Sequence, residues 1–142
     1  MKKFLLTFIA VSTVFLISCR TSDVMVLEGK WKTAEIRADD SERYLPDEME
    51  FFPDKTVAMP GFTDKKMPFK TEPTGEEKKL IRENFPDAEG KNILFIKFDP
   101  AQKDWSRSAV FQYTVTGDEL YLRPITEPKA VKFKRVPSAG GK

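Results

Sequence analysis

The 142-residue sequence predicts a mainly β fold, a small antiparallel β-barrel with one short helix. Most of the chain after residue 26 divides into short segments in which apolar and polar residues alternate, separated by turn-forming residues. One segment has the flanking residues and spacing of a helix. A barrel or a two-sheet sandwich fits such short strands, and the barrel removes the exposed sheet edges by closure.

The first strand is predicted from Leu27 onward and is entered through Gly29. Trp31 and Ile36 fall on opposite faces of this strand, which predicts a bulge or bend between them. Residues 39–43 then form a polar loop. Its adjacent aspartates lack the spaced carboxylates and the glycine of a calcium loop, so we interpret it as a solvated loop rather than a metal site.

The next segment predicts a β-hairpin with one apolar face. Met49 and Phe51 alternate with glutamates, residues 53–55 supply a turn, and Val57 and Met59 continue the alternation on the far side.

Apolar side chains and turn formers are mixed between residues 59 and 69. Flexible methionines beside phenylalanines suit a surface that adapts to a ligand, so Met59, Phe62, Met67 and Phe69 are candidates for the mouth of a binding site. The competing interpretation, which we favour for Met67 and Phe69, makes these two residues part of the core of a third strand.

One short helix is predicted over residues 75–84. Thr74 and Glu77 have the spacing of a capping box, and Pro86 stops the run. Leu80, Ile81 and Phe85 gather on one side, so this helix should cover an edge or one end of the sheet.

The remaining segments are strand-like. Residues 93–98 are apolar on both faces, which predicts a strand covered on both sides. Residues 105–122 predict a hairpin in which Trp105, Ala109, Phe111, Tyr113 and Val115 share one face, with a tight turn at 116–119. The closing strand covers 131–134, and residues 138–142 form a disordered tail.

The N-terminus predicts export. Lys2 and Lys3 precede a mostly apolar run, residues 4–17, that is short for a membrane-spanning helix. The following Leu16-Ile17-Ser18-Cys19 resembles the lipobox of bacterial lipoproteins. That resemblance implies cleavage before Cys19 and lipid attachment to its thiol. An ordinary secretory signal or a signal-anchor helix is the alternative, but Cys19 is the only cysteine and an exported lone thiol needs an explanation.

This interpretation divides the chain into four parts: a signal peptide, 1–18; a lipidated cysteine and tether, 19–26; the barrel, 27–137; and the tail. The extended stretch from 20 to 26 reaches at most about 25 Å. The protein should therefore lie close to a membrane through its lipid without spanning it. Arg20 is not the aspartate that retains some Gram-negative lipoproteins in the inner membrane, so an outer membrane, facing the periplasm, is expected in such a cell.

Composition excludes several functions. The chain has no histidine, and with Cys19 lipidated it has no free thiolate, so histidine- or cysteine-dependent metal, haem and nucleophilic sites are excluded. Cleavage removes two of the 24 basic residues and none of the 22 acidic ones, which leaves a formally neutral domain unsuited to nucleic acid. We expect no cofactor and no metal. Carboxylate pairs can hydrolyse glycosides, but nothing places two of them in one cleft, so we expect no enzyme activity.

Four segments together resemble the small lipocalin-like, or calycin-like, domains of bacterial lipoproteins. They are Leu27-Glu-Gly29-Lys-Trp31, Met49-Glu-Phe-Phe-Pro-Asp-Lys55, Tyr113-Thr-Val-Thr-Gly-Asp-Glu-Leu-Tyr-Leu122 and Phe133-Lys-Arg-Val136. The resemblance implies a barrel with structural roles for Gly29, Trp31 and Arg135, the arginine packing across the tryptophan that closes one end. Without the resemblance, Trp31 would be plain core and Arg135 a solvated strand residue.

Two functions follow from these expectations. The first is a lipid-anchored binding protein of the cell envelope for a small apolar ligand or a lipid. The second is a non-catalytic interaction or inhibitor lipoprotein whose barrel is filled by its own 14 aromatic residues beyond the signal and which binds another envelope protein.

The anchor is tested by Cys19→Ser in the full chain. The variant should accumulate as an uncleaved precursor without lipid, because the thiol is the acceptor and its modification precedes cleavage in lipoproteins. Labelling with a radioactive fatty acid, together with the mobility of the protein on a gel, measures both effects. Normal processing of the variant would contradict the assignment.

Overall fold

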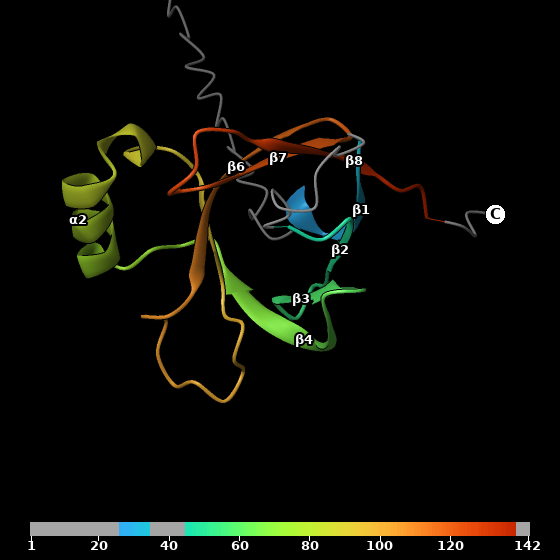
Figure 1. The fold of residues 1–142 in the computed structure, drawn as a ribbon, viewed down its shortest axis with the longest axis horizontal. Helices are drawn as coiled ribbons and strands as arrows, with labels where there is room; N and C mark the ends of the chain where they lie inside the picture. The colour runs from blue at the N-terminus through green and yellow to red at the C-terminus, as the bar shows by residue number, and fades with distance from the viewer. Residues whose placement is uncertain (1–25, 35–44, 139–142) are drawn as a thin grey trace, which may run out of the picture.

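The computed structural model describes residues 26–34 and 45–138. Within them, eight antiparallel strands follow one another in chain order around a closed barrel, and the last strand pairs with the first (Figure 1). The predicted fold class is confirmed. The strands are β1 (Gly29–Thr33), β2 (Glu48–Phe51), β3 (Thr56–Met59), β4 (Thr63–Lys70), β5 (Ile93–Ile96), β6 (Ala109–Thr116), β7 (Glu119–Pro124) and β8 (Val131–Arg135).

The connections alternate between the two ends of the barrel because each strand runs antiparallel to its neighbours. We call the end at which β1 begins and β8 ends the floor, and the opposite end the rim. The turns at 52–55 and 117–118 lie at the floor. The connections 60–62, 97–108 and 125–130 lie at the rim.

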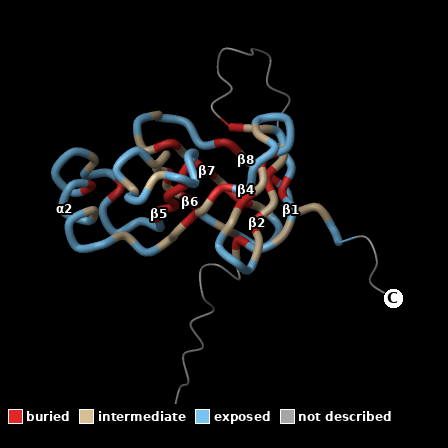
Figure 2. The backbone as a smooth tube through the Cα atoms, turned by 90° about the horizontal axis from the view of Figure 1, so that it is seen from below, coloured by how far each residue is buried: buried red, intermediate tan, exposed pale blue. Residues whose placement is uncertain are grey.

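The barrel interior is packed with the chain's own side chains. On β7, Leu120 and Leu122 are fully buried while their neighbours are partly exposed, and the other strands except β5 repeat this alternation over at least part of their length. Trp31, Met49 and Phe133 have none of their surface exposed, and they belong to one continuous apolar cluster. Figure 2 shows that the buried segments concentrate in the strands. The inner face of the sheet is therefore the hydrophobic core.

The predicted tight turns form as their residues require. The β6–β7 hairpin has the two-residue turn Gly117-Asp118, in which Gly117 has φ +59° and supplies the positive φ of a type II′ turn. The β2–β3 turn places Lys55 at φ +61°, and the Asp54 carboxylate accepts hydrogen bonds from the backbone and hydroxyl of Thr56. The hydrogen bonds from Thr56 lower the pKa of Asp54.

The predicted helix is confirmed as α2 (Gly75–Asn84), and its capping box is complete. The Glu77 backbone donates to the Thr74 hydroxyl at 3.2 Å, and the Thr74 backbone donates to the Glu77 carboxylate at 2.8 Å. The short 3-10 helix η2 (Pro86–Ala88) follows it. The helix does not cover a sheet edge, since the closed barrel leaves none; its Ile81 belongs to a second apolar cluster on the outside of the barrel.

That second cluster explains why β5 is apolar on both faces. Leu94 and Ile96 point into the barrel core, whereas Ile93 and Phe95 join the outer cluster beneath α2. The strand is buried on both sides, as its sequence predicts. The first strand is shorter than predicted, and Ile36, with the bend expected before it, lies outside the described residues.

At the floor, Arg135 contacts residues at the seam, the pairing between β8 and β1 that closes the barrel. Its guanidinium carbon lies 4.1 Å from the centre of the Trp31 ring, and Trp31 donates its indole N–H to the Leu27 carbonyl at 2.8 Å. Arg135 also donates to the carbonyls of Glu28, at 2.5 Å, and Val26, at 3.1 Å. A cation over an indole ring contributes about 0.5–2 kcal/mol.

Gly29 makes room for this arginine. Its φ is +114°, and a Cβ built on it would lie 3.1 Å from Arg135 Nη1. Replacement by any other residue therefore combines a strained backbone with a crowded guanidinium.

Gly29→Ala should lower the free energy of unfolding by about 2 kcal/mol, measured by urea titration. Gly61→Ala separates the backbone strain from the crowding of Arg135. Gly61 has φ +81° but open space around its Cβ position, so this variant should lose stability through backbone strain alone. Gly75→Ala, with no positive φ and no neighbour, should change stability little. Equal losses at Gly29 and Gly61 would contradict the crowding of Arg135.

Candidate functional site

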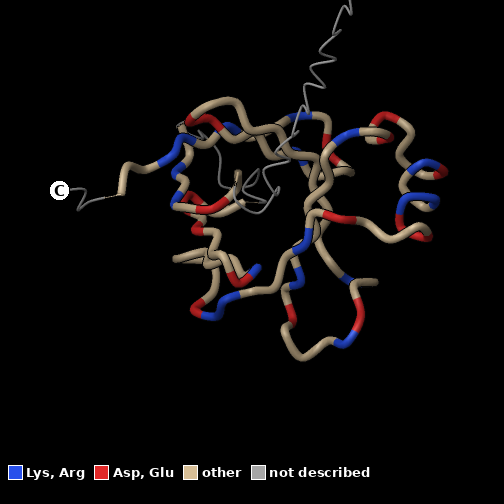
Figure 3. Tube along the Cα trace, turned by 180° about the vertical axis from the view of Figure 1, so that it is seen from behind, with Lys and Arg blue, Asp and Glu red and all other residues tan. Residues whose placement is uncertain are grey.

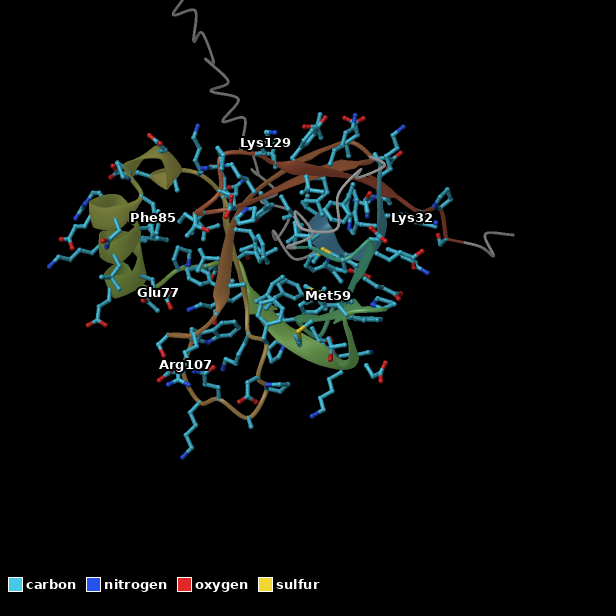
Figure 4. All side chains as sticks on the ribbon, viewed as in Figure 1. Lys32, Met59, Glu77, Phe85, Arg107 and Lys129 are labelled. Carbon is cyan, nitrogen blue, oxygen red and sulfur yellow. The ribbon has the colours of Figure 1, made fainter. Side chains whose placement is uncertain are left out.

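The four predicted mouth residues do not form one surface. Met59, Met67 and Phe69 are buried in the barrel interior with at most 2% of their surface exposed, and Figure 4 shows Met59 inside the barrel. Phe69 packs edge-on against Phe51, with ring centres 5.1 Å apart. The alternative interpretation of Met67 and Phe69 as core residues of a strand is therefore confirmed, with β4 as the strand.

Phe62 lies apart from the other three, in the β3–β4 turn at the rim. It is 55% exposed, and its ring lies 5.8 Å from that of Phe98, which comes from the β5–β6 connection and is 40% exposed. Two neighbouring exposed phenylalanines form a small apolar patch, which we call the rim pair. The rim pair is one surface on which the barrel can contact something else.

A second candidate site lies on the outer wall of the barrel. A pocket of about 530 Å³, which we call the wall pocket, opens between α2 and the outer face of β5 and β6. This volume falls within the range of small-molecule sites, about 300–1,000 Å³. Its lining residues are Thr74, Glu76, Glu77, Leu80, Ile81, Asn84, Phe85, Phe95, Asp104, Trp105, Ser106, Ser108, Val110 and Ile125.

The walls of this pocket are mainly apolar and come from three parts of the chain. Leu80, Ile81 and Phe85 come from the α2 side, where Figure 4 places Phe85 and Glu77 between the helix and the barrel. The barrel and its rim connections supply most of the opposite wall, including Trp105 and Ile125. Leu80 is 58% exposed, so apolar surface is left uncovered at the edge of the pocket.

Two lysines pack against the pocket's tryptophan from outside its lining. Lys70 Nζ lies 4.9 Å and Lys97 Nζ 4.5 Å from the centre of the Trp105 ring. Lys97 is only 7% exposed and donates to the Gln102 carbonyl at 2.9 Å. These contacts hold Trp105 against the barrel wall.

An ion pair joins α2 to the end of β4. Lys70 Nζ lies 2.7 Å from both carboxylate oxygens of Glu77. Burial raises the pKa of Glu77, but the hydrogen bonds from Lys70 and from the Thr74 backbone outweigh it and bring the pKa below its usual value. The carboxylate that completes the capping box is thus also the tie between helix and barrel.

The connection between β5 and β6 shapes the remaining side of the pocket. Asp104 accepts hydrogen bonds from the backbone and hydroxyl of Ser106, which lower its pKa. Ser108 donates its backbone N–H to the Trp105 carbonyl at 3.1 Å. Its hydroxyl oxygen is buried and finds no hydrogen-bond partner among the described residues.

Sequence reasoning missed the wall pocket because it assigned Trp105 to the inner face of a strand. The strand begins only at Ala109, and the turn around Asp104 breaks the alternation, so Trp105 packs in the outer cluster instead. The outward apolar residue Val110, on a strand whose other face fills the core, was the available signal.

Acidic and basic residues are interspersed along the described chain, without an extended basic run (Figure 3). Residues 26–34 and 45–138 contain no group of three acidic, cysteine or histidine side chains arranged to hold a metal ion. Among those residues, no helix is long and apolar enough to cross a membrane. Cys19 lies outside the described residues.

Comparisons with protein-family models, with curated proteins and with solved structures found no match to this chain.

Glu77→Gln should reduce stability at neutral pH by about 1 kcal/mol, because glutamine keeps the cap but loses the charge that pairs with Lys70. The folded-state pKa of Glu77 lies below its usual 4.5, so its contribution is present above that pH and is lost as the pH falls through the folded-state pKa.

Urea titrations at neutral and acidic pH measure this difference. The difference in the free energy of unfolding between wild type and Glu77→Gln should disappear at acidic pH. The control is Glu83→Gln, on the same helix, where the pair with Lys79 is exposed and long at 3.9 Å. A gap that persists unchanged below the pKa range would contradict the role of the Glu77 charge.

Proposed function

We propose that this chain is a lipid-anchored, non-catalytic binding protein of the cell envelope, that it takes a small apolar ligand or lipid, and that the ligand occupies the wall pocket. The observation that carries the proposal is the apolar pocket of about 530 Å³ between α2 and an otherwise packed barrel. A packed interior supports a site on the outside, and a concave apolar surface is the usual form of such a site.

The rest of the proposal comes from the sequence. The lipobox-like segment ending at Cys19 supports anchoring at a membrane, with Arg20 favouring the outer membrane of a Gram-negative cell. The absence of histidine and of a second cysteine supports binding rather than catalysis. The closed eight-stranded barrel, with a tryptophan and an arginine at its floor, supports kinship with lipocalin-like domains.

A second candidate function rests on the rim pair. Phe62 and Phe98 are exposed and adjacent, which supports contact between the rim and another envelope protein. In that case the barrel is a scaffold, and the wall pocket has no ligand.

Native mass spectrometry separates these proposals. The chain from Arg20 onward, which contains all eight strands, is incubated with a lipid and metabolite extract of its source cells. The wild type should retain an added mass after desalting. Leu80→Asn should lower its occupancy at least about tenfold, because a polar amide at the pocket edge opposes apolar binding without adding charge, while a half-exposed position leaves the fold intact.

Phe62→Asn is the matched variant at the other site, since Phe62 is exposed to a similar extent. It should retain the added mass. Loss of the mass in Phe62→Asn but not in Leu80→Asn would move the ligand to the rim, where sequence reasoning first placed it. A protein that stays bare in every extract would support the filled-barrel interaction protein.

A further inference from the structure

We propose that the wall pocket selects cationic amphiphiles, molecules with an apolar chain and one ammonium-type head, over anionic ones of the same chain length. This inference rests on the proposed function, because it assumes that the wall pocket is the ligand site. Its basis is the sign of the charges that line the pocket.

All the ionisable side chains that line the wall pocket are acidic. Glu76, Glu77 and Asp104 contribute to the lining, and the described lining includes no lysine or arginine. Lys70 neutralises Glu77 through two contacts of 2.7 Å. Two carboxylates, on Glu76 and Asp104, remain to meet the head of a ligand.

These two carboxylates lie on opposite walls. Glu76 is in the first turn of α2, and Asp104 is in the β5–β6 connection next to Trp105. Glu76 forms no ion pair with the residues that the structure describes. Asp104 accepts both its hydrogen bonds from Ser106, an uncharged partner, so its negative charge is oriented but not cancelled by an ion pair.

The nearby cations do not reverse this sign. Lys97 and Arg107 act on Asp104 only at longer range, and Arg107 is outside the pocket lining. The Lys97 ammonium group donates to the Gln102 carbonyl and lies against the Trp105 ring. Lys97 and Lys70 are outside the lining of the pocket. A cationic head therefore meets carboxylates first, whereas a carboxylate head meets like charge.

The apolar walls account for the rest of the ligand. Leu80, Phe85 and Ile125 offer surface to a hydrocarbon chain. The Ser108 hydroxyl, buried and without a partner among the described residues, is a polar atom in the same wall whose hydrogen-bonding capacity is unused. A ligand with an apolar chain and one polar head can contact both the apolar walls and the Ser108 hydroxyl. A pure hydrocarbon can contact only the apolar walls.

The test is calorimetric titration of the chain from Arg20 onward with three probes of equal chain length, decylamine, decanol and decanoate. The titrations are done at neutral pH, low salt and concentrations below micelle formation. Decylamine should bind about tenfold more tightly than decanoate, with decanol between them, since the two carboxylates attract an ammonium head and repel a carboxylate head. Added salt should reduce the preference.

The double variant Glu76→Gln with Asp104→Asn should remove most of this preference while decanol binding stays unchanged. Both residues are exposed, and asparagine keeps an oxygen that can accept from Ser106. Glu83→Gln is the control, because it removes a charge from α2 outside the pocket lining and should leave the preference intact.

Decanoate binding as tightly as decylamine, or an unchanged preference in the double variant, would overturn the inference. If Leu80→Asn abolishes the ligand mass from the extract while the three probes bind equally or not at all, the preference for cationic heads is wrong and the proposed function stands. If neither the extract nor any probe binds the wild type, both fail.

Discussion

The contact between Arg135 and Trp31 joins the two strands that close the barrel. The two residues face each other in the pairing of β8 with β1, so the arginine lies at the seam where the last strand meets the first. It also holds the carbonyls of Val26 and Glu28, the residues through which the chain enters the barrel. Because β1 has only five residues, few backbone hydrogen bonds connect β1 to β8 at this seam. The Arg135 side chain adds contacts there, since it lies over the Trp31 ring and donates hydrogen bonds to the backbone that leads into β1.

Closure has a consequence for where a ligand can bind. Once the inner face of every strand fills the core, polar and adaptable surface remains only on the outer wall and at the ends. The outer wall is apolar where β5 and β6 carry Phe95 and Val110 outward, and the long connection between β4 and β5 places α2 over that region. The wall pocket is thus a product of a helix laid on a barrel that is already packed, rather than of a barrel left hollow.

The sequence predicted the parts of this structure that depend on local chemistry. The capping box of Thr74 and Glu77 placed α2 at its observed bounds, and the alternation in β6 and β7 placed their hairpin. Period-two patterns identify which residues share a face but not what covers that face, so Met59 suggested a mouth although it lies in the core. Trp105 was assigned to the wrong face because a hydrogen-bonded turn at Asp104 interrupts the strand pattern. The seam contact of Arg135 came only from a family resemblance, since no local rule links residues so far apart in the chain.

The way α2 is held explains why a pocket can persist beside it. A helix of ten residues is marginal alone and normally gains its stability by burying an apolar face. Here Ile81 is the only buried residue of the helix, with 9% of its surface exposed, while Leu80 stays largely exposed at the pocket edge. The capping box and the Lys70 ion pair supply local stabilisation that packing does not, which lets the helix stand over the barrel without collapsing onto it. A ligand that filled the gap would supply the missing apolar contacts, so binding and helix stability are linked: whatever occupies the wall pocket should also protect α2 from local unfolding.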